Sequence, residues 1–385
     1  MCSFIMDFTF PEELVLLRET VKRYVDKELR PLEKGIEEAG KADPEVLRLL
    51  RLKAAKLGIY AHNLPTEIGG GGLNCLGQVV VAEELGRTTM PLSRSAGYLP
   101  ALLSYCNPQQ QSWFVDPLVS GEKFVTYAVT EPDAGSDVGS TKTRASKVND
   151  GWILNGGKCF VSNVDIADWV IVVAVTDAQA TINNRFTLFI VEKSNPGFHF
   201  VRNIRKIGWH GAEFCQFSLD DCHVSNDCII GEVNGGFELI MLAINLTRIH
   251  LGGIYVGMGL ELRDLAVAYA KQRKTFGKRL GDHQAIQFML ADIDCELEAC
   301  RLLVYAAADA YDKGHSDMRI AASRAKLMGS EMAFRTADRV LQIFGAAGVS
   351  CDYPIERMFR DSRAFRIGEG TSEIQRTQIA RHLLR

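Results

Sequence analysis

The sequence lacks the features that mark several large classes of proteins. Its ten cysteines include no CxxC pair and no Cys/His cluster at zinc spacing, so no metal site is expected. The net charge is only −3, and no Lys/Arg run forms a nucleic-acid-binding patch. No apolar run reaches the roughly 18 uncharged residues that a membrane span needs. The start, MCSFIMDF, is too short for a signal peptide.

The cysteines indicate the redox compartment. Several lie in apolar stretches, among them Cys159, Cys295 and Cys300. This placement is typical of reduced, buried thiols that act as small hydrophobic side chains. We therefore expect a soluble protein of a reducing compartment, either the bacterial cytoplasm or the mitochondrial matrix.

Common nucleotide and nucleophile motifs are also missing. The chain has no P-loop and no GxSxG. The glycine-rich stretch GGIYVGMG, residues 252–259, has no strand before it and no acidic residue at the distance that a dinucleotide-binding fold requires. We interpret these glycines as small residues that let two helices pack closely.

The pattern of apolar residues divides the 385 residues into three domains. Residues 1–120 carry helical periodicity, with Asp43 before Pro44 at the start of one helix and Gly86 near the end of another. Residues 121–234 are rich in β-branched and aromatic residues and predict a β-sandwich or barrel. Residues 235–385 return to helical spacing and predict a four-helix bundle.

The expected strands and bundle helices are read from short segments. The strand segments are FVTYAVT, GWILNG, KCFVSN, DWVIVVAVT, RFTLFIVE and EFCQFSLDD, with turn residues between them. One expected helix places Ile286, Met289, Ile293, Leu297, Cys300 and Val304 at steps of three and four. The fold class is therefore α+β, in three consecutive domains.

Two stretches carry candidate chemistry. In TYAVTEPDAGSDVGS a strand-like start breaks into a polar loop, which presents the hydroxyls of Thr130 and Ser136 to a ligand or forms an ordinary β-turn. In FRIGEGTSEIQR, Glu369 lies between Gly368 and Gly370, and Glu373 follows four residues later. Each carboxylate is either a catalytic base or a surface charge at a helix start.

These stretches, together with GGKCFVSN, LTRIHLGG, QRKTFGKRLGDHQAIQFMLADI and LQIFGAAG, closely resemble the acyl-CoA dehydrogenases. The resemblance runs in order over essentially the whole chain. It implies a tightly bound FAD between the β domain and the bundle, and a homotetramer built as a dimer of dimers. It also implies oxidation of an acyl-CoA thioester to the enoyl-CoA, with hydride transfer to flavin N5 and electrons passed to an electron-transferring flavoprotein.

The resemblance identifies Glu369 as the base that removes the α-proton. Some members of the family carry the base on a helix instead, at a position that matches Thr247, which is not a base. Glu373 is expected at the start of the last helix, where the helix dipole favours a carboxylate, with a flavin contact as an addition. The residues matched to the acyl-CoA are Ser136, Arg248 and Gly370.

The cofactor residues are likewise implied by the resemblance. The residues matched to FAD are Tyr127, Val129, Thr130, Ser136, Phe160, Val161, Ser162, Arg273, Phe276, Gln284, Gln342, Gly345, Thr371 and Glu373. Of these, Arg273, Phe276 and Gln284 are expected to reach the FAD of a neighbouring subunit. Ordinary alternatives exist, namely strand packing for Phe160 and a solvated basic turn around Arg273.

One departure from the family pattern bears on the substrate. Gly368 stands before the base where a larger residue is common, which predicts space for a bulkier, branched or polar acyl group. The alternative activities are an enoyl-CoA reductase, an acyl-CoA oxidase and a dehydrogenase of carrier-protein thioesters. An alternative outside enzymology is a flavin-free structural or binding protein of the same architecture.

Overall fold

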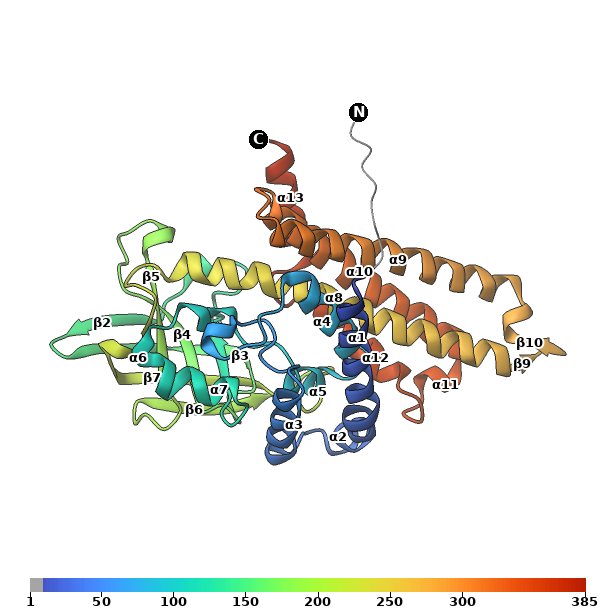
Figure 1. Cartoon of the computed structure of the whole chain (residues 1–385), viewed down its shortest axis with the longest axis horizontal. Helices are drawn as coiled ribbons and strands as arrows, with labels where there is room; N and C mark the ends of the chain where they lie inside the picture. Colours follow the sequence, from blue (N-terminus) through green and yellow to red (C-terminus); the bar gives the residue numbers. More distant parts are fainter. Residues whose placement is uncertain (1–9) are drawn as a thin grey trace.

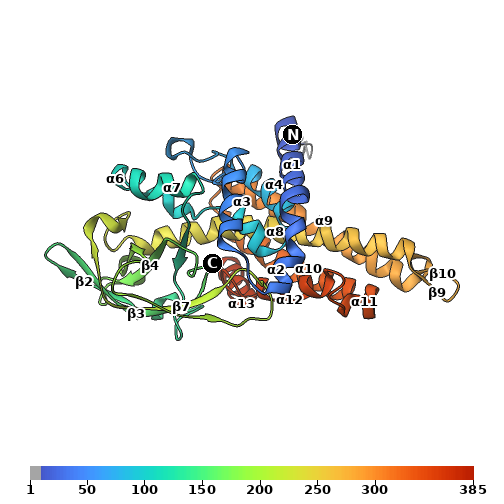
Figure 2. The ribbon, with the colours of Figure 1, turned by 90° about the horizontal axis from the view of Figure 1, so that it is seen from below.

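A computed structural model describes residues 10–385, so the expectation about MCSFIMDF lies outside the described residues. The three predicted regions follow one another along the chain as expected. The β-sheet lies at one end of the molecule and the long helices extend to the other, with the N-terminal helices packed against the middle (Figure 1; Figure 2). This arrangement confirms the predicted fold class.

The N-terminal region is helical, as its capping residues indicate. The Asp43 side chain accepts a hydrogen bond from the backbone N–H of Glu45, and Pro44 opens the helix. Gly86 ends a helix in which every residue but Leu76 is buried. The helices are α1 (Glu12–Tyr24), α2 (Glu33–Ala39), α3 (Pro44–Lys56), α4 (Cys75–Leu85), α5 (Met90–Ser95), α6 (Pro108–Gln110) and α7 (Asp116–Val119).

The middle region is a sheet in the strand order β6-β7-β3-β2-β4-β5-β8, with β1 paired to β4. Its two halves are joined by one residue pair, Arg144 with Val175, and they share a single apolar core. The strands are β1 (Val125–Ala128), β2 (Arg144–Val148), β3 (Gly151–Ser162), β4 (Trp169–Val175), β5 (Phe186–Glu192), β6 (Phe198–Ile204), β7 (Phe214–Ser225) and β8 (Ile229–Ile230).

The segments GWILNG and KCFVSN are one continuous strand, β3, and not two strands. The pairing with β7 shifts register after Leu154 and again after Lys158. Gly156 has φ +151°, and a Cβ there would lie 2.5 Å from the Thr143 hydroxyl. The glycines therefore accommodate a bulge within the strand, where the sequence had indicated a turn.

The C-terminal region contains the three long helices and the closing helix α13 that were predicted, together with α11 and α12, which were not predicted. The helices are α8 (Gly236–Gln272), α9 (Gln284–Asp312), α10 (Met318–Phe344), α11 (Ala346–Val349), α12 (Ile355–Phe365) and α13 (Ser372–Leu383). A small hairpin of β9 (Lys274–Thr275) and β10 (Lys278–Arg279) joins α8 to α9.

Helix α8 is the central element of the bundle, and it packs against α4, α9 and α10. Two of its glycines face α4 at very short range: a Cβ on Gly253 would lie 2.8 Å from the Ala82 Cβ, and one on Gly257 would overlap the backbone of Glu83. The interpretation of GGIYVGMG as a close-packing surface is thus confirmed. By length and composition alone α8 could cross a membrane, yet more than half of its most apolar window is buried within the protein.

The cysteines of the described residues are unpaired. Cys159 and Cys300 are buried as expected, but Cys295 is exposed on α9. The expectation for Cys295 was wrong because the apolar stretch around it is one face of an amphipathic helix, and Cys295 lies on the other face.

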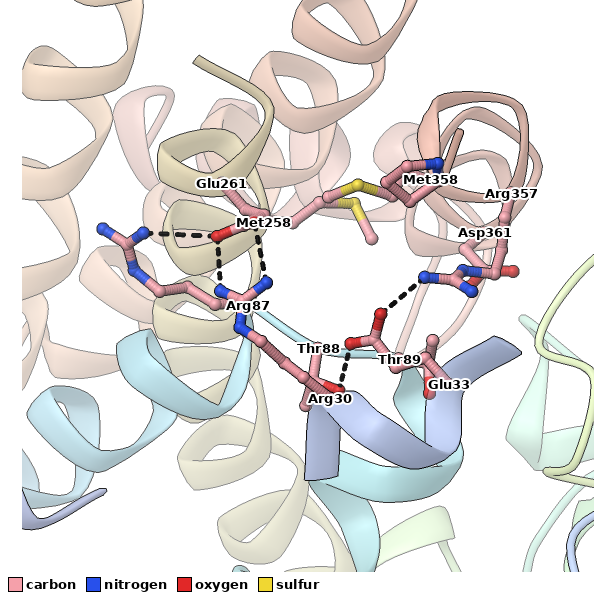
Figure 3. A pocket seen from close by; sticks show the side chains of 11 residues that line it. Arg30, Glu33, Arg87, Thr88, Thr89, Met258, Glu261, Arg357, Met358 and Asp361 are labelled. Atoms are coloured by element: carbon pink, nitrogen blue, oxygen red, sulfur yellow. Dashed lines mark hydrogen bonds and ion pairs between the residues drawn. The ribbon is translucent and has the colours of Figure 1, made fainter. Parts of the chain in front are cut away.

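Ion pairs join the N-terminal helices to the bundle around a cavity of about 20 Å³ (Figure 3). Arg30 donates to both carboxylate oxygens of Glu261, at 2.7 and 2.6 Å. Glu33 accepts hydrogen bonds from Arg357 at 2.7 Å and from Thr88 at 2.6 Å. Because its charged side chains already pair with one another, we assign this cavity a role in holding the domains together.

Candidate active site

Glu369 lies in the turn between α12 and α13 in an unusual backbone conformation, with φ +55°. A left-handed conformation of a residue with a Cβ costs roughly 1–2 kcal/mol and calls for an explanation. The Glu369 carbonyl accepts hydrogen bonds from Arg248 at 3.0 Å and from Gln375 at 3.3 Å. The next carbonyl, of Gly370, accepts from Lys326 at 2.7 Å and from Gln375 at 2.9 Å. These three side chains hold the turn in its strained form.

The two glycines beside Glu369 differ in their surroundings. Gly370 has φ +88°, and a Cβ there would lie 2.8 Å from the Gln375 amide nitrogen and 2.9 Å from the Arg248 guanidinium. Around Gly368 the nearest atom to such a Cβ is 3.9 Å away. Gly370 is therefore required by the packing of the turn, whereas Gly368 leaves open space next to Glu369.

The Glu369 carboxylate is oriented by a residue from the β domain. The Tyr127 hydroxyl, at the end of β1, donates a hydrogen bond of 2.7 Å to Glu369 Oε1. Burial and the neighbouring Glu369 charge hold the pKa of Tyr127 well above its usual value. Tyr127 is therefore a protonated donor at neutral pH, and Glu369 Oε2 stays free to accept a proton.

Two buried cations lie behind this turn. Arg248 on α8 also donates to the Asn245 side chain, at 3.1 Å. Lys326 on α10 is fully buried, and its burial together with the Arg248 charge lowers its pKa to about 8. The backbone N–H of Glu369 donates no hydrogen bond within residues 10–385. The cations thus fix the turn, and this N–H remains available to a ligand.

The β3 bulge presents the residues expected to face the flavin. Phe160 has φ +55°, and 55% of its surface is exposed. The alternative that Phe160 is ordinary strand packing does not fit, because the ring is not packed in the core. Ser162 is partly buried and Val161 is buried between them.

A buried ion pair supports the polar loop that contains Val129, Thr130 and Ser136. Lys158 donates 2.8 and 2.9 Å hydrogen bonds to Glu131 Oε1 and to the Val129 carbonyl. Glu131 also accepts from the backbone N–H groups of two later residues of the loop. Val129 and Thr130 are partly buried, and Ser136 is exposed near the tip. The buried ion pair therefore holds the loop in a defined conformation, and the loop is not simply a solvated turn.

A second group of predicted cofactor residues lies at the far end of the bundle from the sheet (Figure 1). Arg273 ends α8, Phe276 lies in the β9–β10 hairpin with 94% of its surface exposed, and Gln284 begins α9. Gln342 and Gly345, at the end of α10, are exposed as well. Within one chain the structure does not bring this group together with Glu369.

Thr371 and Glu373 form the start of α13. The Thr371 hydroxyl accepts a hydrogen bond from the backbone N–H of Ile374 at 3.3 Å and so caps the helix. Glu373 is exposed in the first turn, and its pKa is lowered by hydrogen bonds to its own backbone N–H and to Thr371. This matches the expectation of a carboxylate favoured at a helix N-terminus.

Sequence reasoning missed several residues that shape the site. Lys326 and Gln375 are buried among helical residues, and nothing in their spacing separates them from surface charges. Lys158 stood within a recognised stretch, but its partner Glu131 lies 27 residues away. The one sequence signal that could have identified Lys326 or Lys158 as buried is a charged residue at an otherwise apolar helix or strand position.

Family models match most of the described chain. Residues 11–122 match the N-terminal domain of acyl-CoA dehydrogenases, residues 126–222 the middle domain, and residues 234–384 the C-terminal domain.

Similar curated proteins include a probable acyl-CoA dehydrogenase of Mycobacterium leprae, 34% identical over 98% of this chain and 97% of that protein. The human mitochondrial short-chain specific acyl-CoA dehydrogenase is 36% identical over 97% and 91%. A 3-(aryl)acrylate reductase of Clostridium sporogenes is 35% identical over 98% and 100%.

Similar solved structures include butyryl-CoA dehydrogenase from Megasphaera elsdenii, with a TM-score of 0.90, 31% identity and coverage of 99% and 100%. The FAD complex of PigA has a TM-score of 0.92 at 26% identity, covering 98% and 99%. A chain solved in work on the electron-transferring flavoprotein of Acidaminococcus fermentans has a TM-score of 0.91 at 30% identity, covering 99% and 100%.

Proposed function

Because this chain belongs to the acyl-CoA dehydrogenase family of FAD-dependent oxidoreductases, we propose that it oxidises an acyl-CoA to the enoyl-CoA with Glu369 as the base. The observation that carries the proposal is the 2.7 Å hydrogen bond between Tyr127 and Glu369. It joins the β domain to a strained turn that three buried side chains hold in place.

Several residues around Glu369 have distinct roles in the proposed removal of the α-proton. Tyr127 occupies Glu369 Oε1, so Oε2 accepts the α-proton of the thioester. An α-CH is a very weak acid, and its removal requires donors where the enolate charge develops. The free N–H of Glu369 supplies one such donor. Arg248 and Lys326 keep the turn from relaxing when the proton is transferred.

The residues also fit FAD, the cofactor of the family. A bound FAD would supply the acceptor for the β-hydrogen, which leaves the substrate as hydride. The exposed Phe160 ring supplies an apolar face for an isoalloxazine, and Ser162 and Thr130 supply hydroxyls beside it. Ser136, near the exposed tip of the loop, is proposed to contact the CoA as well.

The outer group of cofactor residues supports an oligomer. Arg273, Phe276 and Gln284 are exposed and lie at the opposite end of the bundle from Glu369. Arg273 has the planar cation that suits a pyrophosphate. We propose that this end completes the FAD site of a second copy, in a tetramer built as a dimer of dimers, with Gln342 and Gly345 beside the adenosine.

The relatives support proposals for the electron acceptor and the compartment. We propose that an electron-transferring flavoprotein reoxidises the enzyme, since one structural neighbour comes from work on such a protein. The bacterial relatives and the human mitochondrial one support the bacterial cytoplasm or the mitochondrial matrix.

The test of the proposal is Glu369→Gln in the FAD-loaded protein. Anaerobic mixing with a panel of acyl-CoA thioesters should bleach the wild-type flavin and leave the variant at least about 100-fold slower, because a positioned base contributes at least that much. FAD content and ligand binding should stay unchanged. Glu19→Gln, on the exposed face of α1, is the matched control. Near-normal bleaching of Glu369→Gln would assign proton removal to another residue.

A reductase acting on an enoyl-CoA is the second candidate, favoured by the similarity to the 3-(aryl)acrylate reductase. The same site geometry serves both directions. Chemically reduced enzyme mixed with enoyl-CoA thioesters separates them: rapid flavin reoxidation by the enoyl-CoA, with slow reduction by acyl-CoA, would favour the reductase. Peroxide formation in air would instead indicate an oxidase, and reduction only by carrier-bound thioesters would indicate a carrier-protein dehydrogenase.

A further inference from the structure

The connection between β6 and β7, residues 205–213, lies against the helix that leads to the active-site turn. In this connection Trp209 has φ +57°, a left-handed conformation that is strained for a residue with a Cβ. Gly208 lies so close to α12 that an added Cβ would be 2.5 Å from Asp361 Oδ1. A strained residue next to a closely packed glycine indicates that specific contacts hold this connection in place.

Asp361 on α12 binds Trp209 at two points. One carboxylate oxygen, Oδ1, accepts a 2.5 Å hydrogen bond from the Trp209 backbone N–H. The indole Nε1–H of Trp209 donates to the Asp361 backbone carbonyl at 3.0 Å. Asp361 is only 3% exposed, so water does not compete for these bonds. The Asp361–Trp209 contact therefore holds both the backbone and the ring of Trp209 against α12.

Folding stability alone does not account for a carboxylate at this position. Burial raises the pKa of Asp361 to about 6, because the ionised form is poorly solvated inside the protein. The neighbouring arginines of α12 donate to other carboxylates, Arg357 to Glu33 at 2.7 Å and Arg360 to Glu37 at 2.5 Å. Since the unfolded chain ionises this group at lower pH than the folded chain does, ionised Asp361 lowers the stability at neutral pH. A residue that costs stability is expected where a function depends on it.

On the helix side, the contact reaches the last turn of α12. Phe365 follows Asp361 by four residues and lies on the same face of the helix. Its ring is 1% exposed and lies 5.9 Å from the Trp209 indole and 4.4 Å from the Tyr255 ring on α8, measured between centroids. Trp209 therefore packs directly against the end of the helix from which the active-site turn begins.

The active-site turn is bonded to this same end of α12. The backbone N–H groups of Ile367 and Gly368 donate to the Ala364 carbonyl at 3.0 and 3.1 Å. Glu369 is the next residue along the chain. A shift of the last turn of α12 therefore moves the base as well.

On the sheet side, the contact reaches the strand proposed to face the flavin. The Trp209 ring lies 5.6 Å from that of Phe214, the first residue of β7, in an edge-to-face arrangement. Phe214 pairs with Ser162 at the end of β3. The Asp361–Trp209 contact thus connects the turn that carries Glu369 to the flavin-facing end of β3, at a second place besides the Tyr127–Glu369 hydrogen bond.

We propose that Asp361 is a positioning residue for the reaction: through Trp209 it fixes the Glu369 turn relative to the flavin-facing end of β3. The role requires the acceptor oxygen of Asp361 and not its negative charge. This inference rests on the proposed function, because the distance matters only if Glu369 removes a proton while the β-hydrogen leaves toward the flavin. It goes further by naming the pair of residues that sets that distance.

The test compares Asp361→Ala, which removes the acceptor, with Asp361→Asn, which keeps an acceptor oxygen without the charge. Leu118→Ala, fully buried on α7, is the control for a general loss of core packing. Flavin reduction is followed anaerobically in the FAD-loaded proteins at saturating acyl-CoA. The limiting rate should fall at least about 10-fold in Asp361→Ala, since a misplacement by about 1 Å costs up to about 100-fold. The Kd for the thioester should stay unchanged, and Asp361→Asn and Leu118→Ala should keep most of the rate.

Two further measurements separate positioning from a general loss of stability. Backbone hydrogen exchange of residues 366–372, measured in the FAD-loaded protein without substrate, should become faster in Asp361→Ala and not in Leu118→Ala. With a thioester deuterated at the α-carbon, the isotope effect on flavin reduction should rise in Asp361→Ala, because proton removal by a displaced base becomes a larger part of the barrier. Leu118→Ala should leave this isotope effect at its wild-type value.

Three results would overturn the inference. One is an unchanged rate and unchanged exchange in Asp361→Ala, and another is an equal loss of rate in Leu118→Ala. A rate in Asp361→Asn as slow as that in Asp361→Ala would assign the effect to the charge. Should Asp361→Ala fail to fold, Trp209→Phe, which removes only the indole donor, is compared with the wild type, and equal rate and exchange would count against the inference. Failure of the proposed function looks different, because no thioester would bleach the wild-type flavin, and the exchange of residues 366–372 would still test Asp361.

Discussion

The two ends of the helical bundle carry predicted cofactor residues in opposite physical states. At the inner end, the carbonyls of Glu369 and Gly370 both accept hydrogen bonds, which the buried Lys326, Arg248 and Gln375 supply. At the outer end, in the β9–β10 hairpin, Phe276 is almost fully exposed. The inner end is built in advance within one chain, whereas the outer end has the surface of a site that another copy completes.

This difference predicts that the inner end determines the rate of flavin reduction and that the outer end determines the affinity for FAD. A base held at left-handed φ needs a rigid frame, and that frame must exist before the substrate binds. The outer residues need only meet a cofactor tail, so they gain their contacts on assembly. Substitutions at the inner end should therefore change folding stability and catalysis together, and those at the outer end should leave the rate of flavin reduction in the FAD-loaded protein unchanged.

The largest expected effect is that of Lys158→Met, which leaves the Glu131 carboxylate buried without a cation beside it. Breaking a buried ion pair from one side costs about 3–5 kcal/mol, because an uncompensated charge remains. Urea denaturation of the variant measures the loss. Removing both partners, in Lys158→Met with Glu131→Gln, should restore much of it. Lys142→Met, which breaks an exposed pair with Asp133 on the same loop, should leave the midpoint unchanged. Equal losses in the two single variants would contradict the prediction.

Alanine at two left-handed glycines compares the ends directly. Gly370→Ala should lose about 1–2 kcal/mol of folding stability, because alanine is strained at this left-handed φ. Steric overlap with Gln375 and Arg248 should add a further loss of about 1–3 kcal/mol. Gly277→Ala in the hairpin, with φ +78° and no atom within 4 Å of the added Cβ, should lose only the stability that the left-handed φ costs. Denaturation midpoints should rank the variants in that order, and flavin reduction should slow only in Gly370→Ala. A matching loss of rate in Gly277→Ala would remove the distinction between the two ends.

The smallest effect on stability is expected for Phe276→Ala. The side chain is exposed, so the free energy of unfolding of the FAD-free chain should change by no more than about 0.5 kcal/mol. FAD retention on dilution should nevertheless fall, because the ring is proposed to serve a neighbouring copy. Gel filtration with absorbance at the flavin band follows both properties. Leu384→Ala, exposed near the C-terminus, is the control. Retention equal to that of the wild type would place Phe276 outside the cofactor site.

The sequence predicted the fold where local signals agree with tertiary packing. Asp43 and Pro44 marked a helix start, Gly86 a helix end, and the glycines of GGIYVGMG a close helix contact. The β3 bulge was misread, because Gly156 and Gly157 carry the same signal in a turn and in a bulge. Cys295 was misplaced because periodicity does not show which helix face meets a neighbour.

For the site, the family resemblance supplied Glu369 and Tyr127 as candidates, but it did not supply their contact. That contact joins residues 242 positions apart. Charges become informative only when their partners, or the absence of partners, are known in three dimensions.

The length of α8 ties the two ends together mechanically. Arg248 lies within α8, and Arg273 follows its last residue, 25 positions later along one uninterrupted helix, which corresponds to roughly 37 Å of rise. If each of two copies completes the FAD site of the other with its outer end, the length of α8 sets the distance between the two active sites. Insertion of a single helical turn between the two arginines would offset each copy by about 5 Å and disable both halves of the pair together.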